Sequence, residues 1–251
     1  MLSHPHNCER LLSRWRSLAN RLNWKVAELC RDGEDPILAI ENEAARATDT
    51  TGIYLSAGVH GDECAPAWGL LQWAETLTPA DIVNRRPLVI LPCLNPHGFS
   101  RNARLDSRGL DLNRNFQNDE VPVIEAWQRF LGNRGFDVAL NLHEDYDANG
   151  VYLYEIAKAR SIGHRLLDAC ESLIPRESSS EVDGVPMNRG LLNRTEDIVD
   201  QELGGWPEAI YLFLKRETDS YTFETPSEFD LERRVATHKR FIETMVELNA
   251  R

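Results

Sequence analysis

The chain has 251 residues, a formal net charge of −12 at pH 7, and 42% hydrophobic and 27% charged residues. These values are typical of a globular protein and exclude a disordered chain, since enough apolar side chains are present to build a core. The acidic balance excludes nucleic acid as a partner, because a phosphate-binding surface needs a cationic face. No apolar run is long enough to cross a membrane, and the N-terminal residues lack the apolar core of a secretory signal. We therefore expect a cytoplasmic protein with neither a membrane nor a nucleic-acid partner.

The N-terminal third of the chain is predicted to contain two helices and three strands. Residues 6–22 place their apolar side chains at helical spacing. Three short strand-like runs follow at 24–30, 36–42 and 52–59. A second helix is expected over 66–77, because its proline falls in a first turn, where proline is tolerated.

The rest of the chain continues the alternation of strands and helices. The run at 87–94 is apolar throughout, which is typical of a strand in a sheet covered on both faces. The other expected elements are strands at 136–143, 151–156 and 220–226 and helices at 158–173 and 228–248. This order indicates an α/β fold, a single domain with a mixed, mostly parallel central sheet and helices on both faces.

Two further features bear on organisation and compartment. Residues 174–207 are rich in Ser, Gly, Asn and acidic residues, and long irregular segments of this kind often rim a site. The five cysteines are an odd number without paired spacing, so we expect free thiols in a reducing compartment.

Ionisable side chains follow two of the predicted strands. His60 and Glu63 come directly after one strand, and Gly61 between them is predicted to let the chain turn so that both face one ion. His143 ends another apolar strand. Two histidines and one carboxylate are a ligand set of hydrolytic zinc, with a fourth position left to water. The alternative is that each histidine is a capping or core residue.

A local basic segment lies at 95–116, directly after an apolar strand. Its guanidinium groups suit carboxylates, so the segment suggests a bound anion in an otherwise acidic chain. The alternative is a solvated loop whose arginines pair with Asp106 and Asp111. The four arginines of the segment are Arg101, Arg104, Arg108 and Arg114.

Glu224 lies within the strand-forming segment SYTFETP. Glutamate is disfavoured in strands and is costly to bury without a partner. If Glu224 faces a metal-activated water, it is a general base. If it faces solvent, it has no catalytic role.

Four separated motifs, HGDE, NPHG…RGLDLNRNF, a strand ending in LH, and TFETP, occur here in the order found in a known family. In this respect the chain resembles the zinc metallocarboxypeptidases of the carboxypeptidase A-like family, and its length is similar to that of the compact bacterial branch that includes murein peptide amidases. It is more distantly similar to the aspartoacylase/succinylglutamate desuccinylase group, which shares HGxE, DLNR and a late glutamate. The resemblance implies one catalytic α/β domain over residues 1–251 and one zinc per chain.

The resemblance also implies the roles of the metal ligands and the base. The residues His60, Glu63 and His143 match the zinc ligands of the family. Glu224 matches the general base, and Arg104 matches the arginine that polarises the scissile carbonyl.

Substrate binding is implied by three further positions. Asn113 and Arg114 match the pair that binds the terminal carboxylate of the substrate. Tyr211 is the nearest candidate for the tyrosine that assists the substrate end in many members, but its spacing to Glu224 does not align. Glu144 and Asp145 follow the third ligand, where digestive enzymes carry serine and tyrosine. A second metal is left open by the acidic residues near the ligands in sequence, Asp62, Glu144, Asp145 and Asp147, although one zinc is expected.

The function implied is zinc-dependent hydrolysis of an amide bond next to a free carboxylate, in a peptide or an acyl-amino acid. The alternatives are deacylation of N-acyl amino acids, action as a murein peptide amidase, and a non-enzymatic binding module on the same scaffold. The sequence leaves the oligomeric state and the preferred side chain open.

Overall fold

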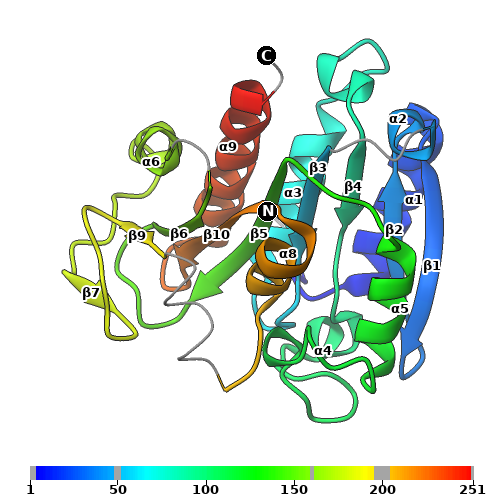
Figure 1. Cartoon of the computed structure of the whole chain (residues 1–251), viewed down its shortest axis with the longest axis horizontal. Helices are drawn as coiled ribbons and strands as arrows, with labels where there is room; N and C mark the ends of the chain where they lie inside the picture. Colours follow the sequence, from blue (N-terminus) through cyan, green and yellow to red (C-terminus); the bar gives the residue numbers. More distant parts are fainter. Residues whose placement is uncertain (1–3, 48–51, 159–160, 195–203, 250–251) are drawn as a thin grey trace.

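An eight-stranded mixed sheet runs through the centre of the molecule in the order β1-β2-β4-β3-β5-β10-β6-β9 (Figure 1). The computed structural model describes residues 4–47, 52–158, 161–194 and 204–249. Four of the seven neighbouring strand pairs are parallel, which confirms the predicted mixed, mostly parallel sheet. The strands are β1 Lys25–Asp32, β2 Asp35–Glu41, β3 Ile53–Ala57, β4 Leu88–Leu91, β5 Val138–Asp145, β6 Tyr152–Ile156, β9 Leu191–Asn193 and β10 Asp219–Pro226.

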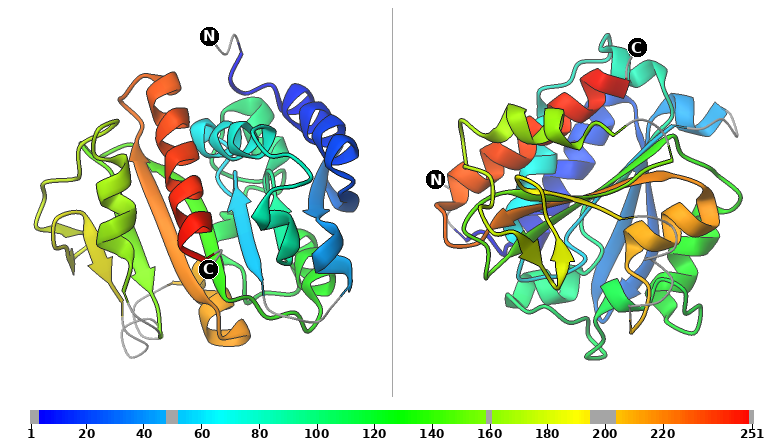
Figure 2. Two further views of the ribbon diagram at one scale, coloured as in Figure 1. Left: turned by 90° about the horizontal axis from the view of Figure 1, so that it is seen from above. Right: turned by 60° about the vertical axis from the view of Figure 1, so that its left-hand side comes forward.

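Helices cover both faces of this sheet (Figures 1 and 2). The helices α1, α3, α6 and α9 pack together on one face, and α5 and α8 lie on the other. A small hairpin of β7 Glu181–Val182 and β8 Val185–Pro186 stands beside β9. The α-helices are α1 Cys8–Leu22, α2 Glu43–Ala47, α3 Cys64–Glu75, α4 Pro96–Arg101, α5 Pro122–Leu131, α6 Gly163–Cys170, α8 Glu208–Arg216 and α9 Leu231–Asn249, and 3-10 turns lie at Ile82–Arg85 and Leu112–Arg114.

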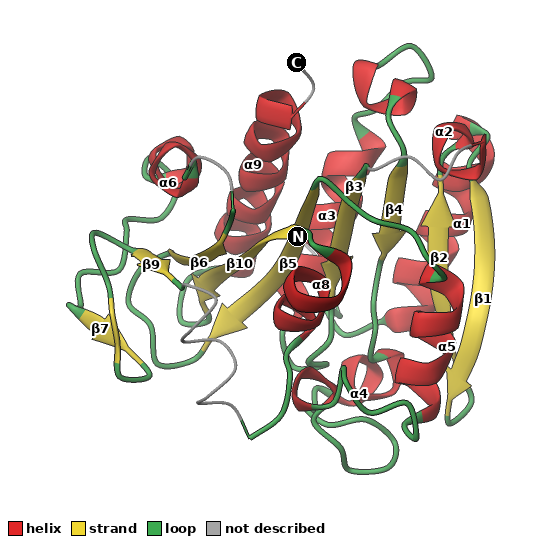
Figure 3. Ribbon diagram, in the orientation of Figure 1, coloured by secondary structure: helices red, strands yellow, loops and turns green. Residues whose placement is uncertain are grey.

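The central strands are buried on both faces, which explains their continuous apolar sequences. Alternate side chains of each strand point to opposite faces. Leu55 and Leu140 join the core beneath α3 and α9, whereas Tyr54 and Ala139 join the core beneath α5 and α8. Figure 3 shows the two helical layers with the sheet between them.

Each of the seven predicted strands is present, with ends within three residues of those expected. The first two form an antiparallel hairpin, which the sequence did not specify. The helix predicted at 158–173 is shorter, Gly163–Cys170, and residues 159–160 lie outside the described part of the chain. In the irregular region 174–207 the structure contains β7, β8 and β9, and residues 195–203 are not described.

The five cysteines are free, as predicted. Cys64 is buried in the first turn of α3, next to Glu63, and burial raises the pKa of its thiol to about 12. A thiol of that kind packs as a small apolar residue and is a poor metal ligand. Within the described residues, no helix has the length and apolar character needed to cross a membrane.

His238 of α9 is fully buried against the sheet, with its Nε2 2.9 Å from the hydroxyl of Thr225. Burial, reinforced by the nearby Arg234 cation, lowers the pKa of His238 to about 3. The folded protein therefore keeps this imidazole neutral at pH values where the unfolded chain, with a pKa of about 6.5, takes up a proton.

We expect this proton to weaken folding by about 1.4 kcal/mol for each pH unit below about 6.5. Urea unfolding near pH 7.5, 6 and 5 measures the effect as a steeper loss of free energy in the wild type than in His238→Leu. His4→Asn, which alters an exposed histidine, is the control and should keep the wild-type slope. Equal slopes for the wild type and His238→Leu would contradict the assignment.

Candidate active site

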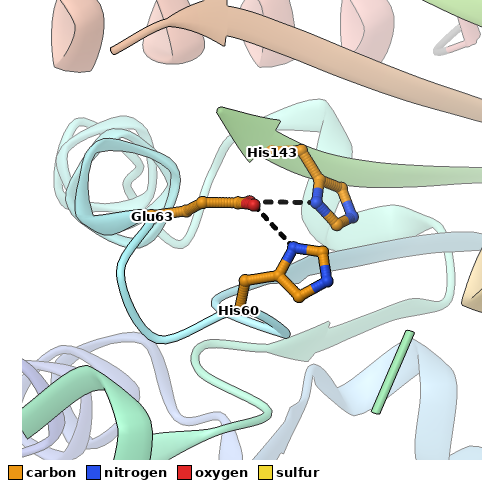
Figure 4. Close-up of side chains that lie close together, drawn as sticks. All are labelled: His60, Glu63 and His143. Carbon is orange, nitrogen blue, oxygen red and sulfur yellow. Dashed lines mark hydrogen bonds and ion pairs between the residues drawn. The ribbon is translucent and has the colours of Figure 1, made fainter. Parts of the chain in front are cut away.

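The structure brings His60, Glu63 and His143 together in one buried cluster (Figure 4). His60 lies in the loop after β3, Glu63 is the residue before α3, and His143 lies near the end of β5. The Nδ1 atoms of His60 and His143 are 2.5 Å and 2.9 Å from the two carboxylate oxygens of Glu63. All three side chains are at most 4% exposed, and their potential ligand atoms lie within 4.8 Å of one another.

The loop that delivers His60 is shaped by two glycines. Gly58 adopts a positive φ of 63°, a conformation that glycine enters without strain. Gly61 has no positive φ, but a Cβ there would lie 2.0 Å from the backbone carbonyl carbon of Gly98. The sequence interpretation of Gly61 is therefore corrected: this residue allows close packing of α4 against the loop, and Gly58 provides the turn.

The three residues suit a zinc ion through the chemistry of their donor atoms. Two imidazole nitrogens and one carboxylate oxygen form a common zinc set that leaves a position for water. Burial alone raises the pKa of Glu63, but the adjacent His60 and His143 hold it well below its usual range, so the carboxylate stays ionised. Among the residues that the structure describes, this is the one group of three or more such side chains placed to hold a metal.

Neighbouring groups hold the cluster in this arrangement. Asp111 accepts a hydrogen bond from Nε2 of His60 at 3.2 Å, and the backbone N–H of Glu144 donates to Glu63 at 3.1 Å. The Glu144 carboxylate accepts from the backbone N–H of Ala65 at 2.9 Å and pairs with Arg234 of α9. Helix α3, which begins beside Glu63, is thereby joined to β5, which carries His143.

Glu224 lies beside the cluster because of strand register. It is the parallel partner of His143 between β10 and β5, and the antiparallel partner of Tyr152 between β10 and β6. We call His143, Glu224 and Tyr152 the upper row. Burial raises the pKa of Glu224 to about 8, against the attraction of the nearby His143. Glu224 is only 9% exposed and lines the pocket, as the general-base interpretation requires.

Arg104 lies at the edge of the same cluster. Its guanidinium donates twice to Asp111, at 3.1 Å and 3.0 Å, and its Nη1 is 3.7 Å from Glu63. Against the effect of burial, the hydrogen bonds from His60 and Arg104 hold the pKa of Asp111 well below its usual range. Asp111 thus links a predicted metal ligand to the arginine predicted to polarise the scissile carbonyl.

Asn113 and Arg114 line the same pocket. Asn113 is buried, and its Oδ1 accepts a hydrogen bond from the backbone N–H of Glu208 at 3.0 Å. Arg114 is exposed, and its Nη1 donates to the carbonyl of Asn113 at 2.9 Å.

Tyr211 is not brought to the pocket. It lies in α8 with its ring 5.2 Å from that of Trp127 in the core. Three other tyrosines, Tyr146, Tyr152 and Tyr154, do line the pocket.

The pocket has a volume of about 380 Å³, enough for a dipeptide-sized ligand. Several of its lining residues were missed by the sequence analysis, notably Asn141, Tyr152, Tyr154, Asp183 and Arg194. Asn141 had a visible signal, since it lies two residues before His143 on one strand and therefore on the same face. Arg194 had none, because it reaches the pocket only through the pairing of β9 with β6.

Replacing Asp111 with asparagine is expected to weaken metal binding about 10- to 100-fold, because partners of ligating histidines contribute on this scale. The amide keeps the shape but loses the charge that faces His60 and Arg104. Competition with a zinc chelator dye measures the change, and Asp106→Asn, in the same segment, is the control. A zinc affinity equal to that of the wild type would contradict this role.

The fold of this domain is metallocarboxypeptidase-like. A solved structure of a predicted metallopeptidase from Shewanella denitrificans OS217 superposes with a TM-score of 0.84 at 22% identity, covering 98% of this chain and 92% of the other. A metallo-carboxypeptidase from Burkholderia cenocepacia gives 0.71 at 17% identity, covering 95% and 68%. At these identities the likeness establishes the fold.

The family is given by the sequence itself. The model of the succinylglutamate desuccinylase/aspartoacylase catalytic domain matches residues 49–174, which is 126 of the 251 residues, and the chain belongs to this family. Murein peptide amidase A of Escherichia coli (strain K12) is 42% identical over 73 residues, 29% of this chain and 28% of that protein. Carboxypeptidase D of Mus musculus is 27% identical over 176 residues, 55% of this chain and 13% of that protein. The matched segments thus span less than a third of each relative.

Proposed function

We propose that this protein is a zinc-dependent hydrolase that cleaves an amide bond next to a free carboxylate. The observation that carries the proposal is the joint placement of two histidines and two glutamates. His60, Glu63 and His143 form a buried ligand set, and Glu224 lies next to His143 on the neighbouring strand. The position of Glu224 on the wall of a 380 Å³ pocket supports a role in the reaction.

A zinc ion held by His60, Glu63 and His143 would supply a Lewis acid and would lower the pKa of water to about 7. Glu224 takes the proton from the attacking water and returns it to the leaving amine. One positioned carboxylate can serve in both halves of this exchange. Arg104 donates hydrogen bonds to the carbonyl oxygen as negative charge develops on it, a contribution typically worth about a hundredfold or more in rate.

Two further residues that line the pocket bind the substrate by its free carboxylate. Asn113 and Arg114 offer an amide and a guanidinium, which are donors suited to a carboxylate. Binding of the substrate by a free carboxylate makes the reaction exo-acting, because an internal amide bond has no carboxylate to offer. Peptides and acyl-amino acids with a free carboxylate are therefore the proposed substrates.

A second candidate is deacylation of N-acyl amino acids. It is favoured by the match to the succinylglutamate desuccinylase/aspartoacylase catalytic domain. A third, action on murein peptides, is favoured by the 73-residue similarity to murein peptide amidase A. All three candidate functions are hydrolysis of an amide bond by the residues named above. They differ in the chemical groups on the two sides of that amide bond.

Removal of the metal tests the proposal. Purified protein is expected to contain about one zinc per chain by elemental analysis, and dialysis against a chelator should abolish hydrolysis. One equivalent of zinc should restore it, because the ligand set is formed by the fold. A protein that binds no zinc, or one whose hydrolysis survives complete zinc removal, would contradict the proposal.

A substrate panel separates the candidates. Peptides with a free C-terminus, the same peptides amidated at the C-terminus, N-acetyl-aspartate, N-succinyl-glutamate and γ-D-glutamyl-diaminopimelate peptides are compared with one enzyme preparation. We expect hydrolysis of free-carboxylate peptides and none of their amidated forms. Exclusive hydrolysis of the acyl-amino acids would assign the deacylase function instead.

A further inference from the structure

A second row of side chains lies one pleat deeper than the upper row. Asn141 of β5, Thr222 of β10 and Tyr154 of β6 are paired in register and line the pocket. Each stands two residues from the member of the upper row on its own strand, so the two rows are about 7 Å apart. We call Asn141, Thr222 and Tyr154 the floor row. A substrate side chain of four or five heavy atoms would reach it from the scissile bond.

The amide of Asn141 is held in one orientation by a buried network. Its Nδ2 donates to Oγ of Ser56 at 2.9 Å and to a carboxylate oxygen of Glu208 at 2.7 Å. Glu208 also accepts from Ser56 at 2.6 Å and from the hydroxyl of Tyr54, which itself accepts from Trp127 at 2.8 Å. Reversing the amide would set its carbonyl oxygen against the Glu208 carboxylate, so the network fixes the orientation of the amide.

The atom left over is Oδ1 of Asn141. This oxygen has no hydrogen-bond partner among the described residues. It is also shielded from water, because Asn141 is only 1% exposed. A buried acceptor without a partner costs about 1–3 kcal/mol, which a donor on the substrate would recover. Native proteins leave few such groups, and Asn141, which carries this one, lines the pocket.

A second unpartnered polar atom lies on the other side of the floor row. Arg194 stacks over Tyr154, with its Cζ 5.0 Å from the ring centre, and its Nε has no partner within the part of the chain that the structure describes. This atom is a donor, the opposite of Oδ1 of Asn141. Asp183, the nearby acid, is occupied by the hydroxyl of Tyr154 at 3.1 Å.

We propose that Asn141 determines specificity by accepting a hydrogen bond from the side chain that enters the pocket, with Arg194 donating to the same side chain. The preferred substrate residue then ends in a group that both donates and accepts, of which a carboxamide is the simplest. An aliphatic side chain on the substrate would leave Oδ1 of Asn141 and Nε of Arg194 without hydrogen bonds. A substrate carboxylate would be repelled by the carbonyl oxygen of Asn141 and by the Glu208 carboxylate next to it. This inference rests on the proposed hydrolytic function.

The test compares three C-terminal residues of nearly equal length. N-blocked dipeptides ending in glutamine, glutamate or methionine are offered to the zinc-loaded wild-type protein. We expect kcat/KM for the glutamine peptide to exceed both others at least tenfold, since sites built to pair with a polar group discriminate strongly against analogues that lack it. Equal or better hydrolysis of the methionine or glutamate peptide would overturn the specificity role while leaving the hydrolase intact.

Binding to Glu224→Gln gives a readout that does not need turnover. Calorimetry with the same three peptides should show the glutamine peptide binding at least tenfold more tightly than the methionine peptide. If no peptide is hydrolysed by the wild type yet this order of affinity is seen, the proposed reaction fails and the specificity of the pocket stands. Equal affinities would overturn the role of Asn141.

A variant locates the effect at the floor row. Asn141→Leu removes the acceptor at similar volume and should reduce the glutamine-to-methionine ratio to about one or below. Ile156→Val, which also lines the pocket but carries no polar atom, is the matched control and should keep the ratio. Thermal melting shows whether Asn141→Leu is folded, since Glu208 loses one donor; if it is not, the wild-type panel decides. A folded Asn141→Leu protein with the wild-type ratio would overturn the proposal.

Discussion

Glu224→Gln is expected to lower kcat by about 10²- to 10⁴-fold, the usual contribution of a positioned acid–base residue. The amide has nearly the same size and occupies the same wall of the pocket, but it cannot take a proton from water and return it to the leaving nitrogen. Zinc content and melting temperature should stay close to those of the wild type, because Glu224 is not in the ligand cluster. Steady-state kinetics on a free-carboxylate peptide gives the measurement.

Glu228→Gln is the matched control for this variant. Glu228 is an exposed glutamate shortly after the same strand, so its replacement removes one negative charge without changing the pocket. Its kcat should remain within about twofold of the wild-type value, as surface changes usually have small effects. Undiminished turnover by Glu224→Gln would remove the general base from the proposed reaction.

The second large effect concerns stability and arises from Glu144. Its carboxylate is 1% exposed and pairs with Arg234, which is 14% exposed, and it also accepts from the backbone of Ala65. Glu144→Ala leaves a buried guanidinium without its counter-charge, which typically costs about 3–5 kcal/mol. Burial raises the pKa of Glu144 to about 7, against the attraction of Arg234, so urea unfolding should be measured near pH 8, where the pair is ionised.

A double variant separates the ion pair from the tether to Ala65. Glu144→Met combined with Arg234→Met replaces both charges by apolar side chains, which often restores most of the stability lost by removing one partner. Zinc affinity should be reduced in Glu144→Ala and in the double variant alike, because both lack the acceptor that joins α3 to β5. A loss below about 1 kcal/mol in Glu144→Ala would show that the pair contributes little to folding.

Much of the fold could be predicted because apolar periodicity depends on each segment alone. The runs at 87–94 and 136–143 show burial on both faces directly in their composition. The helices α5 and α8 were not predicted, although Pro122 and Pro207 mark their starts. Which strands pair is a separate question, since register depends on contacts distant in sequence.

The same distinction between local patterns and contacts distant in sequence holds for the residues of the site. Short spacing suggests His60 and Glu63, and their positions in apolar strand segments suggest His143 and Glu224, to which the resemblance to known enzymes adds the roles of ligand and base. Tyr211 is the nearest candidate along the chain for the tyrosine of the known enzymes, but α8 turns its ring into the core beside Trp127. Glu208 could not be assigned from sequence, because its partners Tyr54 and Ser56 lie 154 and 152 residues away.

Because side chains alternate between the two faces of β5 and β10, substitutions and insertions in these strands have different effects on the pocket. The upper row and the floor row are carried by the same strands, yet their side chains are independent positions. Exchanging Asn141, Thr222 or Tyr154 changes the lining of the pocket while the backbone keeps His143 and Glu224 in register. An insertion within either strand would instead displace both rows and turn every following side chain to the opposite face. Divergent relatives should therefore vary by replacement within these strands, and by length only in connections such as residues 146–151.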